Sequence, residues 1–507
     1  MPDNLARNKQ IAKNTIMLYI RMFLVMFVSL YTSRVILNVL GAEDYGVYNV
    51  VGGVITMLSF LNSSLSTATQ RYLNYEMGKN NAKALNKVFS ISFITFCILA
   101  FFAISIAETV GLWFVQNKLV IPIDRMSAAL WVYQFSIMTF AVNMLMIPYT
   151  AAIIANEHMS IYAYVSIVEI ILKLGLVYFL TIINFDKLKL YSIMMFIVTC
   201  LITSIYRIYC IKSFPECHLK FVWDSKLLRK LFSFSGWMLT GTLGRLLCTQ
   251  GINILINMFF GPVFNAAKAI STQVYSSISS FSQNFMTAVR PQIIKSYAQD
   301  DLKYMYRLVF SSSKLSFYLL FVLCLPLIIS AQFVLELWLK NVPDLAVLFT
   351  RLVLIDLLIQ SIYSPITYVS QAANKTREYQ ISITICYVLI FVVSLFLYKI
   401  GCPVYTTFIV SIIIDIIGLF VRLIVVNQTV KFPISAYLKS VIGPAILVVS
   451  ASIIFIIIIN IIINQFTDNM LGIIIASLII PICIVWIIGI DKSEKNLVRN
   501  LIYKLFN

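Results

Sequence analysis

Charged residues are scarce in this chain of 507 amino acids: Asp, Glu, Lys and Arg make up 12% of it, whereas 60% is hydrophobic. A soluble domain covers its surface with more charge than this, and apolar runs such as residues 442–463 are hard to bury inside one. A helix that crosses a bilayer needs about 20 predominantly apolar residues, and such stretches follow one another along the chain. The composition excludes a soluble protein and predicts an all-α, polytopic membrane protein.

The chain also has few of the residues from which catalytic and metal centres are built. It contains 2 His and 9 Cys, with no CxxC spacing and no second ligand pair for His158 or His218. This predicts neither a metal site nor a disulfide framework. No GxxxxGK[ST] motif is present, so we expect no nucleotide site and no cofactor. The outer loops are too short to gather catalytic groups, which disfavours a membrane enzyme such as a polymerase or ligase.

Acidic residues are outnumbered by basic ones, 21 against 39, which gives a net charge of +18. Most of the basic residues fall in short loops without aromatic neighbours, so we expect no nucleic-acid partner. Loops on the cytoplasmic side of a membrane carry an excess of Lys and Arg. The basic residues divide between the two sides in a ratio of roughly 26 to 8, with Arg71, Arg290 and Arg422 counted on the richer side. Both termini are therefore predicted to be cytoplasmic.

About fourteen spans are predicted from the apolar stretches. They are residues 13–39, 45–70, 88–115, 126–155, 161–183, 190–211, 231–260, 263–289, 308–335, 345–372, 379–398, 404–426, 441–463 and 471–490. We expect a six-helix bundle over 1–211, a cytoplasmic linker over 212–230 and a second six-helix bundle over 231–430. An extra helix pair over 431–490 and an amphipathic tail over 491–507 follow. Within the linker, residues 226–231 predict a short helix on the membrane surface.

The two halves resemble each other. The stretch ILNVLGAEDYGVYNVVGGV in the first half is similar to ILINMFFGPVFNAAKAI in the second, with Gly41 matching Gly261. The helices that follow end near Arg71 and Arg290. Halves with an even number of spans share one orientation, so we expect an axis along the membrane normal and a substrate site between the halves. The two glycines are expected to serve tight turns.

Polar residues form stripes along three of the predicted spans. In a membrane such stripes must face a neighbouring helix or a water-filled cavity. The stripe around Arg245 consists of Thr242, Thr249, Gln250, Asn253 and Asn257. The stripe around Lys268 consists of Asn265, Thr272, Tyr275, Ser279 and Gln283. The second span carries Asn49, Gly52, Gly53, Thr56, Ser63, Thr67 and Gln70.

Cations inside the spans need an explanation, because an Arg at the bilayer centre costs about 2.5–3.5 kcal/mol on insertion scales. For Arg21, Arg245 and Lys268 the alternatives are snorkelling, a structural ion pair, or a cavity of positive potential that binds an anion. Lys314 also lies within a span, and Lys173 lies four residues after Glu169, a spacing that predicts a structural pair. Asp356 and Asp415 either neutralise cations of the second half or bind a coupling ion.

The sequence resembles the Wzx-type polysaccharide flippases of the multidrug/oligosaccharidyl-lipid/polysaccharide (MOP) exporter superfamily. The resemblance rests on Arg34, Leu40-Gly41, residues 44–49 (DYGVYN), Gly52-Gly53 and Thr69-Gln70-Arg71, and on the fourteen-span layout. It implies a fold like that of the MATE transporters, with two pseudo-symmetric six-helix bundles around a central cavity. It also implies transfer of an undecaprenyl-diphosphate-linked oligosaccharide to the outer leaflet of a bacterial inner membrane, beside polymerase and chain-length regulator partners.

With this family in view, Arg245, Arg21 and Lys268 are expected to contact the diphosphate. Other polar residues are expected to line the cavity, namely Asn49, Thr56, Thr249, Asn253, Asn265, Thr272 and Gln283. A lipid II flippase handles a similar lipid diphosphate and stays an alternative. A drug/cation antiporter of the same superfamily is disfavoured, because the first two spans carry no acidic residue in their apolar interiors.

Overall fold

A computed structural model of the chain describes residues 2–56, 60–117, 121–183, 185–220, 224–339, 342–343, 345–466, 470–491 and 494–495. Within these ranges the chain is 91% helix, with 17 α-helices and no strand. Twelve of the helical segments are long and apolar enough to cross a membrane. The prediction of an all-α, polytopic membrane protein is confirmed.

The chain divides into two compact units. The N-terminal unit comprises Lys13–Leu239, and the C-terminal unit comprises Thr240–Asn507 together with Met1–Ala12. The division falls inside two long helices, α1 (Pro2–Thr56) and α8 (Ser225–Phe260). The finer domain boundaries expected from the sequence stay a prediction.

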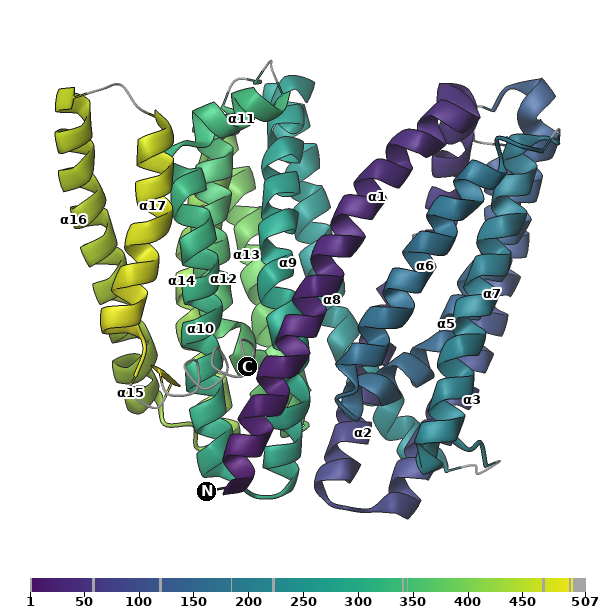
Figure 1. Cartoon of the computed structure of the whole chain (residues 1–507), viewed down its shortest axis with the longest axis horizontal. Coiled ribbons are helices and arrows are strands. Elements are labelled where there is room, and N and C mark those ends of the chain that lie inside the picture. Colours follow the sequence, from purple (N-terminus) through teal and green to yellow (C-terminus); the bar gives the residue numbers. More distant parts are fainter. Residues whose placement is uncertain are drawn as a thin grey trace. The chain divides into compact units, whose positions relative to one another are not determined.

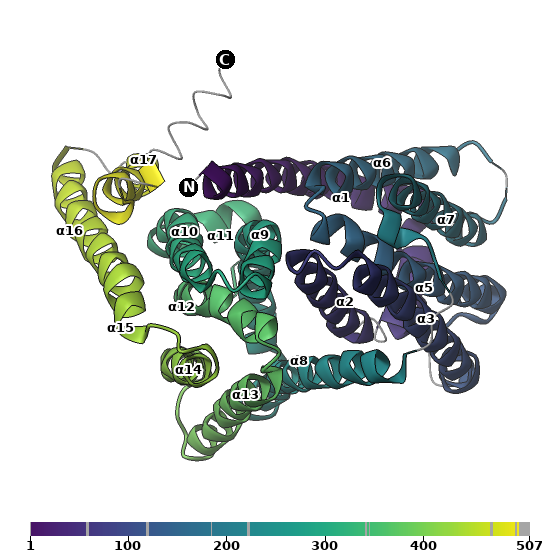
Figure 2. The ribbon, with the colours of Figure 1, turned by 90° about the horizontal axis from the view of Figure 1, so that it is seen from below.

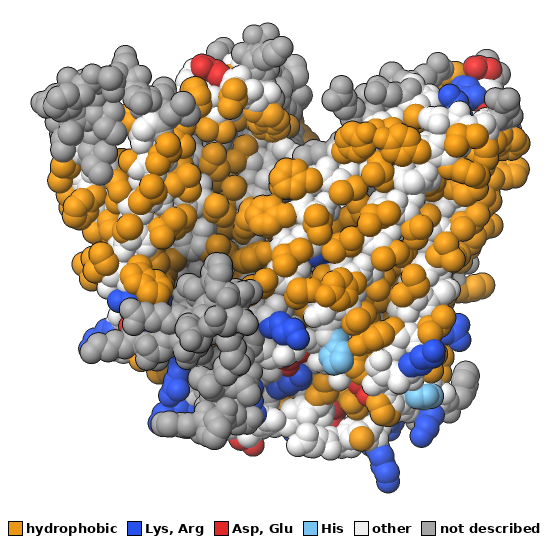
Figure 3. All heavy atoms as spheres, in the orientation of Figure 1, with side chains coloured by type: hydrophobic (Ala, Val, Ile, Leu, Met, Phe, Trp, Pro, Cys, Tyr) orange, Lys and Arg blue, Asp and Glu red, His pale blue; other side chains and the backbone are white. Residues whose placement is uncertain are grey.

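The N-terminal unit is built from helices joined by short connections (Figure 1). After α1 come α2 (Phe60–Gly78), α3 (Ala82–Ile106), α4 (Leu112–Asn117), α5 (Met126–Ala155), α6 (Met159–Phe179) and α7 (Lys187–Ser213). Figure 2 shows α6 beside α7 and α3 beside α5. In the space-filling view of Figure 3, hydrophobic side chains cover the middle of these helices, and Lys and Arg gather near their lower ends. This distribution is typical of helices that cross a bilayer.

The C-terminal unit continues from the second part of α8. It contains α9 (Pro262–Ala298), α10 (Leu302–Ile329), α11 (Ala331–Leu339), α12 (Ala346–Ala372), α13 (Thr376–Lys399), α14 (Thr406–Val430), α15 (Ile434–Tyr437), α16 (Gly443–Phe466) and α17 (Met470–Ile484). Helix α12 packs against α9, α10 and α14, and α13 packs against α14. Helices α16 and α17 pack against each other, and α17 also packs against α10.

Two of the fourteen predicted spans are absent from the twelve apolar segments of the described chain. They are residues 45–70 and 263–289, which carry two of the three polar stripes. Residues 263–289 are nevertheless helical throughout, as part of α9. The polar side chains of residues 263–289 lower the mean hydropathy of this part of α9, although it is long enough to cross a membrane. A polar face of this kind needs a partner other than lipid.

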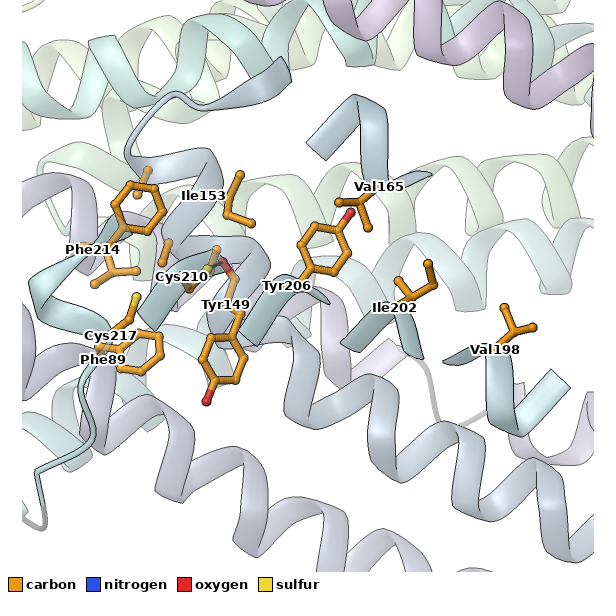
Figure 4. Close-up of a cluster of buried hydrophobic side chains, with 14 of the residues drawn as sticks. Phe89, Tyr149, Ile153, Val165, Val198, Ile202, Tyr206, Cys210, Phe214 and Cys217 are labelled. Carbon is orange, nitrogen blue, oxygen red and sulfur yellow. Dashed lines mark hydrogen bonds between the residues drawn. The ribbon is translucent and has the colours of Figure 1, made fainter. Parts of the chain in front are cut away.

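The core of the N-terminal unit brings together aromatic and aliphatic side chains from α3, α5 and α7 (Figure 4). The rings of Phe89 and Tyr149 meet edge to face, with centroids 5.4 Å apart. Cys210 donates its thiol to the Tyr149 carbonyl oxygen at 3.5 Å. Lipid is as apolar as these side chains, so close packing rather than the hydrophobic effect accounts for most of the stabilisation inside the membrane.

Gly41 and Gly261 adopt the same unusual backbone conformation. Gly41 interrupts α1 with φ 81° and ψ 167°, and Gly261 precedes α9 with φ 90° and ψ 175°. This region of φ/ψ space is essentially restricted to glycine. The prediction that both glycines serve tight turns is confirmed, and the matching conformations support the repeat seen in the sequence.

The predicted surface helix over residues 226–231 is wrong, because these residues form the beginning of α8. A carboxylate oxygen of Asp224 accepts hydrogen bonds from the backbone N–H groups of Lys226 and Leu227, at 2.8 and 3.1 Å, and so caps the helix. A hydrogen bond from Lys87, at 2.5 Å, is the main cause that lowers the pKa of Asp224 to about 2. Most of the predicted amphipathic tail lies outside the described residues.

Three arginines that were counted among the basic residues in or near the cytoplasmic loops lie inside helices. Arg71 belongs to α2, Arg290 to α9 and Arg422 to α14. Their guanidinium carbons lie 4.4, 5.5 and 3.7 Å from the centroid of a tyrosine ring. The apolar stretches used to place the spans end before the helices do. Arg71 and Arg290 were therefore predicted to lie just beyond a span, whereas Arg422 lies within the predicted span 404–426.

Lys314, in α10, is neutralised by the segment that follows α17. Its side chain is 4% exposed, and its ammonium donates to Asp491 Oδ2 at 2.8 Å and to Glu494 Oε2 at 3.0 Å. Glu494 also accepts from the backbone N–H of Asp491 at 3.0 Å. Breaking a buried ion pair is costly because one charge is left unpaired. This triad therefore fastens the end of α17 to α10.

Substitution of the two glycines tests the turns directly. We expect Gly41→Ala and Gly261→Ala each to lower stability by about 1–3 kcal/mol, because an L side chain is strained at these φ values. An added Cβ at either site meets no atom within 4 Å, so any effect arises from the backbone. Gly175, in α6, is equally open but has no such φ, and Gly175→Ala is expected to be neutral or mildly stabilising. Thermal unfolding in detergent compares the three, and equal melting temperatures would contradict the strained turns.

Candidate functional site

The polar stripes of α8 and α9 meet in the C-terminal unit. The ammonium of Lys268 donates to the Thr249 carbonyl oxygen at 3.3 Å, and the Asn265 amide donates to the Asn253 carbonyl oxygen at 3.2 Å. Lys268 is 8% exposed. The structure therefore brings together four of the residues predicted to bind or line the cargo path, and it gives Lys268 a neutral partner.

Arg245 lies on an exposed part of α8. Thr249, one turn further on, donates its hydroxyl to the Arg245 carbonyl oxygen at 2.8 Å. The guanidinium is close enough to Tyr275 and Tyr387 to interact with both electrostatically. In the described part of the chain, no carboxylate forms an ion pair with Arg245. Its charge is therefore available to a ligand.

Helix α9 presents an exposed face made of hydroxyl and amide groups. Thr272 and Gln283 belong to it, as predicted, and it also includes Gln273, Ser276 and Ser277. These residues lie within roughly 140° of one another around the helix. The side chains bond mainly within α9: Thr272 donates to the Lys268 carbonyl oxygen at 2.9 Å, and Gln283 donates to the Ser279 hydroxyl at 3.3 Å. Lipid cannot satisfy such a face, whereas water or sugar hydroxyls can.

A buried carboxylate pair lies behind this face, between α12 and α14. The Gln360 side-chain amide donates to Asp356 Oδ2 at 2.9 Å and to Asp415 Oδ2 at 3.0 Å. The Gln360 carbonyl oxygen accepts from the Tyr275 hydroxyl of α9 at 2.7 Å. The second oxygen of Asp356 is buried without a hydrogen-bond partner. The pair is thus connected to α9 through one amide.

Arg422 supplies positive charge to the carboxylate pair. It is 3% exposed, and its guanidinium stacks over the Tyr363 ring, with 3.7 Å between Cζ and the ring centroid. It interacts electrostatically with both Asp356 and Asp415. Arg422 and Gln360 were not predicted from the sequence as members of this site. The signal was present, because Asp415 and Arg422 are seven residues apart in one helix and so share a face.

Arg21 lies apart from these residues, in the N-terminal unit, where α1 meets α6. Its Nε donates to the Ser166 hydroxyl at 2.9 Å, and its guanidinium lies 4.5 Å from the Tyr162 ring centroid. Both partners are neutral. The predicted pair on α6 is confirmed, with 2.5 Å between Lys173 Nζ and Glu169 Oε1. The side chains of Asn49 and Thr56 lie outside what the structure describes.

Part of the family-like motif has a structural role in the N-terminal unit. Arg125, just before α5, binds Asp44 through two hydrogen bonds, one of them 2.7 Å long from Nε, and reaches Asp186 at 3.2 Å. Hydrogen bonding to Asp44 raises the pKa of Arg125. Asp186 in turn caps α7, accepting from the backbone N–H of Leu188 at 3.0 Å. The motif aspartate thus ties the segment after Gly41 to two other helices.

The described residues contain no group of three or more His, Cys, Asp or Glu placed to hold a metal ion. No protein-family model matches the chain. No curated protein matches it. Solved structures match by fold, and the three described next are 12–13% identical to this chain.

Three transporter structures cover most of the chain. A MATE in the bent conformation has a TM-score of 0.71 at 13% identity, covering 86% of this chain and 98% of its own. An outward-facing multidrug resistance MATE family transporter of the MOP superfamily has a TM-score of 0.70 at 12% identity, covering 85% of this chain and 96% of its own. A MOP superfamily transporter from Pyrococcus furiosus, described as having a binding pocket of reverse polarity, has a TM-score of 0.65 at 13% identity, covering 83% of this chain and 95% of its own. The chain has the MATE fold.

The Gln360 link predicts a graded response to substitution. Gln360→Ala should lower stability by about 1–3 kcal/mol, because the carboxylate pair and the Tyr275 hydroxyl lose their common partner. Tyr275→Phe removes only one of the three hydrogen bonds and should cost about 0.5–1.5 kcal/mol. Gln283→Ala, on the exposed face of α9, serves as the control and should change little. The order of the melting temperatures checks the network, and a Gln360→Ala protein as stable as the control would rule it out.

Proposed function

We propose that the protein is a flippase that carries a polyprenyl-diphosphate-linked oligosaccharide from the cytoplasmic to the outer leaflet of a bacterial inner membrane. In this proposal the MATE fold supplies alternating access, and the cargo feeds the synthesis of O-antigen, capsule or exopolysaccharide. A polysaccharide polymerase and a chain-length regulator would act on the product.

The observation that carries the proposal is the state of three cations inside the helices. Arg21, Arg245 and Lys268 form no ion pair with a carboxylate among the described residues, whereas Lys173 and Lys314 do. A cation kept in a membrane helix without a counter-ion marks a ligand pathway more often than a structural contact. A diphosphate supplies the missing negative charge, and each charge-assisted hydrogen bond contributes about 1.5–3 kcal/mol.

The polar face of α9 supports the carbohydrate part of the cargo. The side chains that carry its hydroxyl and amide groups are exposed, and they form hydrogen bonds mainly within α9. Such groups exchange hydrogen bonds with water or sugars at little cost. The prenyl chain would remain in lipid. Outward movement of a diphosphate with a charge near −2 gains roughly 4–5 kcal/mol from an inside-negative potential of 100 mV, so no nucleotide is needed.

The fold is shared by drug antiporters and by the proposed flippase, and so it does not choose between them. The multidrug resistance transporter among the structural neighbours represents the first class. The Pyrococcus furiosus transporter, whose reverse-polarity pocket suggests a different function, shows that this fold also accommodates a pocket of changed charge. The unpaired cations of the present chain favour an anionic cargo over a cationic drug. A lipid II-type cargo carries the same diphosphate and fits the same cations.

We further propose that Asp356 and Asp415 take up a coupling cation or proton. Both carboxylates accept from the one Gln360 amide, and Asp356 keeps a buried oxygen without a donor. Tyr275 connects this pair to the polar helix α9. Occupancy of the carboxylate pair is thereby linked to the helix that would contact the cargo.

Transport by the full chain in proteoliposomes tests the proposal. The probe is a fluorescent polyprenyl-diphosphate oligosaccharide, whose transfer is followed by its accessibility to a membrane-impermeant quencher. We expect transfer by the wild type and a loss of about 10- to 100-fold in Arg245→Ala and Lys268→Ala, since each removes one charge-assisted contact. Arg245→Lys should retain part of the activity.

Lys87→Ala is the matched control, because Lys87 forms a surface ion pair with Asp224. It should transport at the wild-type rate. Wild-type protein that exports an organic cation, and does not move the lipid-linked sugar, would assign the chain to the antiporter class.

A further inference from the structure

A row of polar side chains runs along one face of α6 in the N-terminal unit. Tyr162, Ser166, Glu169 and Lys173 are spaced by four, three and four residues, which places them within roughly 60° of one another around the helix. Arg21 of α1 joins this row through Ser166 and Tyr162. The row therefore holds three charged groups, the cations Arg21 and Lys173 and the anion Glu169.

These groups lie deep within an apolar span and remain accessible. Glu169 is ten residues from the start of the 21-residue helix α6, which is near its middle. The side chains of Glu169 and Lys173 are each 33% exposed. Their exposed neighbours on α6 are apolar, including Val168 and Ile171. Charge at this depth is rare, and where it occurs it usually marks a pathway.

The contacts inside the row are few. Lys173 donates one hydrogen bond, to Glu169 Oε1 at 2.5 Å, although an ammonium has three donors. Arg21 binds only neutral groups in the row. Glu169 is one turn beyond Ser166, and Arg21 and Glu169 both act electrostatically on the buried Tyr206. One carboxylate thus stands beside two cations and compensates only one of them.

We infer that Glu169 is an internal counter-ion that holds Lys173 until an anionic group of the cargo takes its place. Lys173 and Arg21 then form a diphosphate-binding pair in the N-terminal unit. This inference rests on the proposed function and adds Glu169 and Lys173 to the residues that act in it. A Glu–Lys ion pair spaced i, i+4 on one helix is a weak interaction. A ligand with two negative charges therefore competes with it effectively. Release is favoured in turn, because Glu169 returns to Lys173 when the cargo leaves.

Binding of farnesyl diphosphate to the full chain in detergent tests the inference, with farnesol as the uncharged comparison. Glu169→Gln removes the competing carboxylate at nearly constant shape and should tighten farnesyl diphosphate binding about tenfold. Lys173→Gln should weaken it by a similar factor, and Lys173→Arg should keep it. In the double variant Glu169→Gln/Lys173→Gln the tighter binding should disappear, because the Lys173 ammonium that Glu169→Gln releases is absent. Thermal unfolding checks that each variant folds.

Asp224→Asn is the matched control, since Asp224 forms an ion pair of the same 2.5 Å length with Lys87 outside the spans. Its affinity should equal that of the wild type. If Glu169→Gln binds farnesyl diphosphate no more tightly than the wild type, the counter-ion role is overturned, while the flippase proposal stands as long as the wild type prefers the diphosphate to farnesol. If the wild type shows no such preference, the flippase proposal falls and the inference falls with it.

Discussion

The cost of leaving a charge uncompensated inside a bilayer governs this structure. The chain meets this cost in three ways. Lys314 and Lys173 are paired with carboxylates, and Arg422 is stacked on a tyrosine beside two aspartates. Arg21 and Lys268 have only neutral hydrogen-bond partners, and Arg245 is exposed. In the first two arrangements the chain itself supplies the compensating negative charge. The third calls for a negative charge from outside the chain.

The same constraint accounts for the design of α9. Lipid cannot form hydrogen bonds with a helix face rich in hydroxyl and amide groups. Helix α9 nevertheless runs unbroken from Pro262 to Ala298. It packs against α10 and α12 on its other side, and Tyr275 reaches the amide that binds Asp356 and Asp415. One helix thus carries a polar face and a connection to the buried carboxylates. A change in the charge of those carboxylates would therefore alter the hydrogen bonding of α9, whose polar face we assign to the cargo.

Much of the fold can be predicted from the sequence, because each span is one long, continuous apolar stretch. Residues 126–155 were predicted as a span and form α5 with the same bounds. The turns at Gly41 and Gly261 were also predicted, because they recur at equivalent points of the two halves. Hydropathy misplaces a span boundary where the helix is longer than the apolar stretch, as at Arg290. The partners of Lys314 were not predictable, because Asp491 and Glu494 are far from it in sequence. The contact of Lys268 with a backbone carbonyl likewise leaves no sequence pattern.

The sign of the charge that moves with the cargo distinguishes an anionic cargo from a cationic one. Full-length protein would be reconstituted in one orientation on a solid-supported membrane, and the current would be recorded after a jump in polyprenyl-diphosphate oligosaccharide concentration on the cytoplasmic side. We expect a transient current of negative charge moving outward, enlarged by an inside-negative potential. An outward current of positive charge, evoked by an organic cation and absent with the lipid diphosphate, would contradict it.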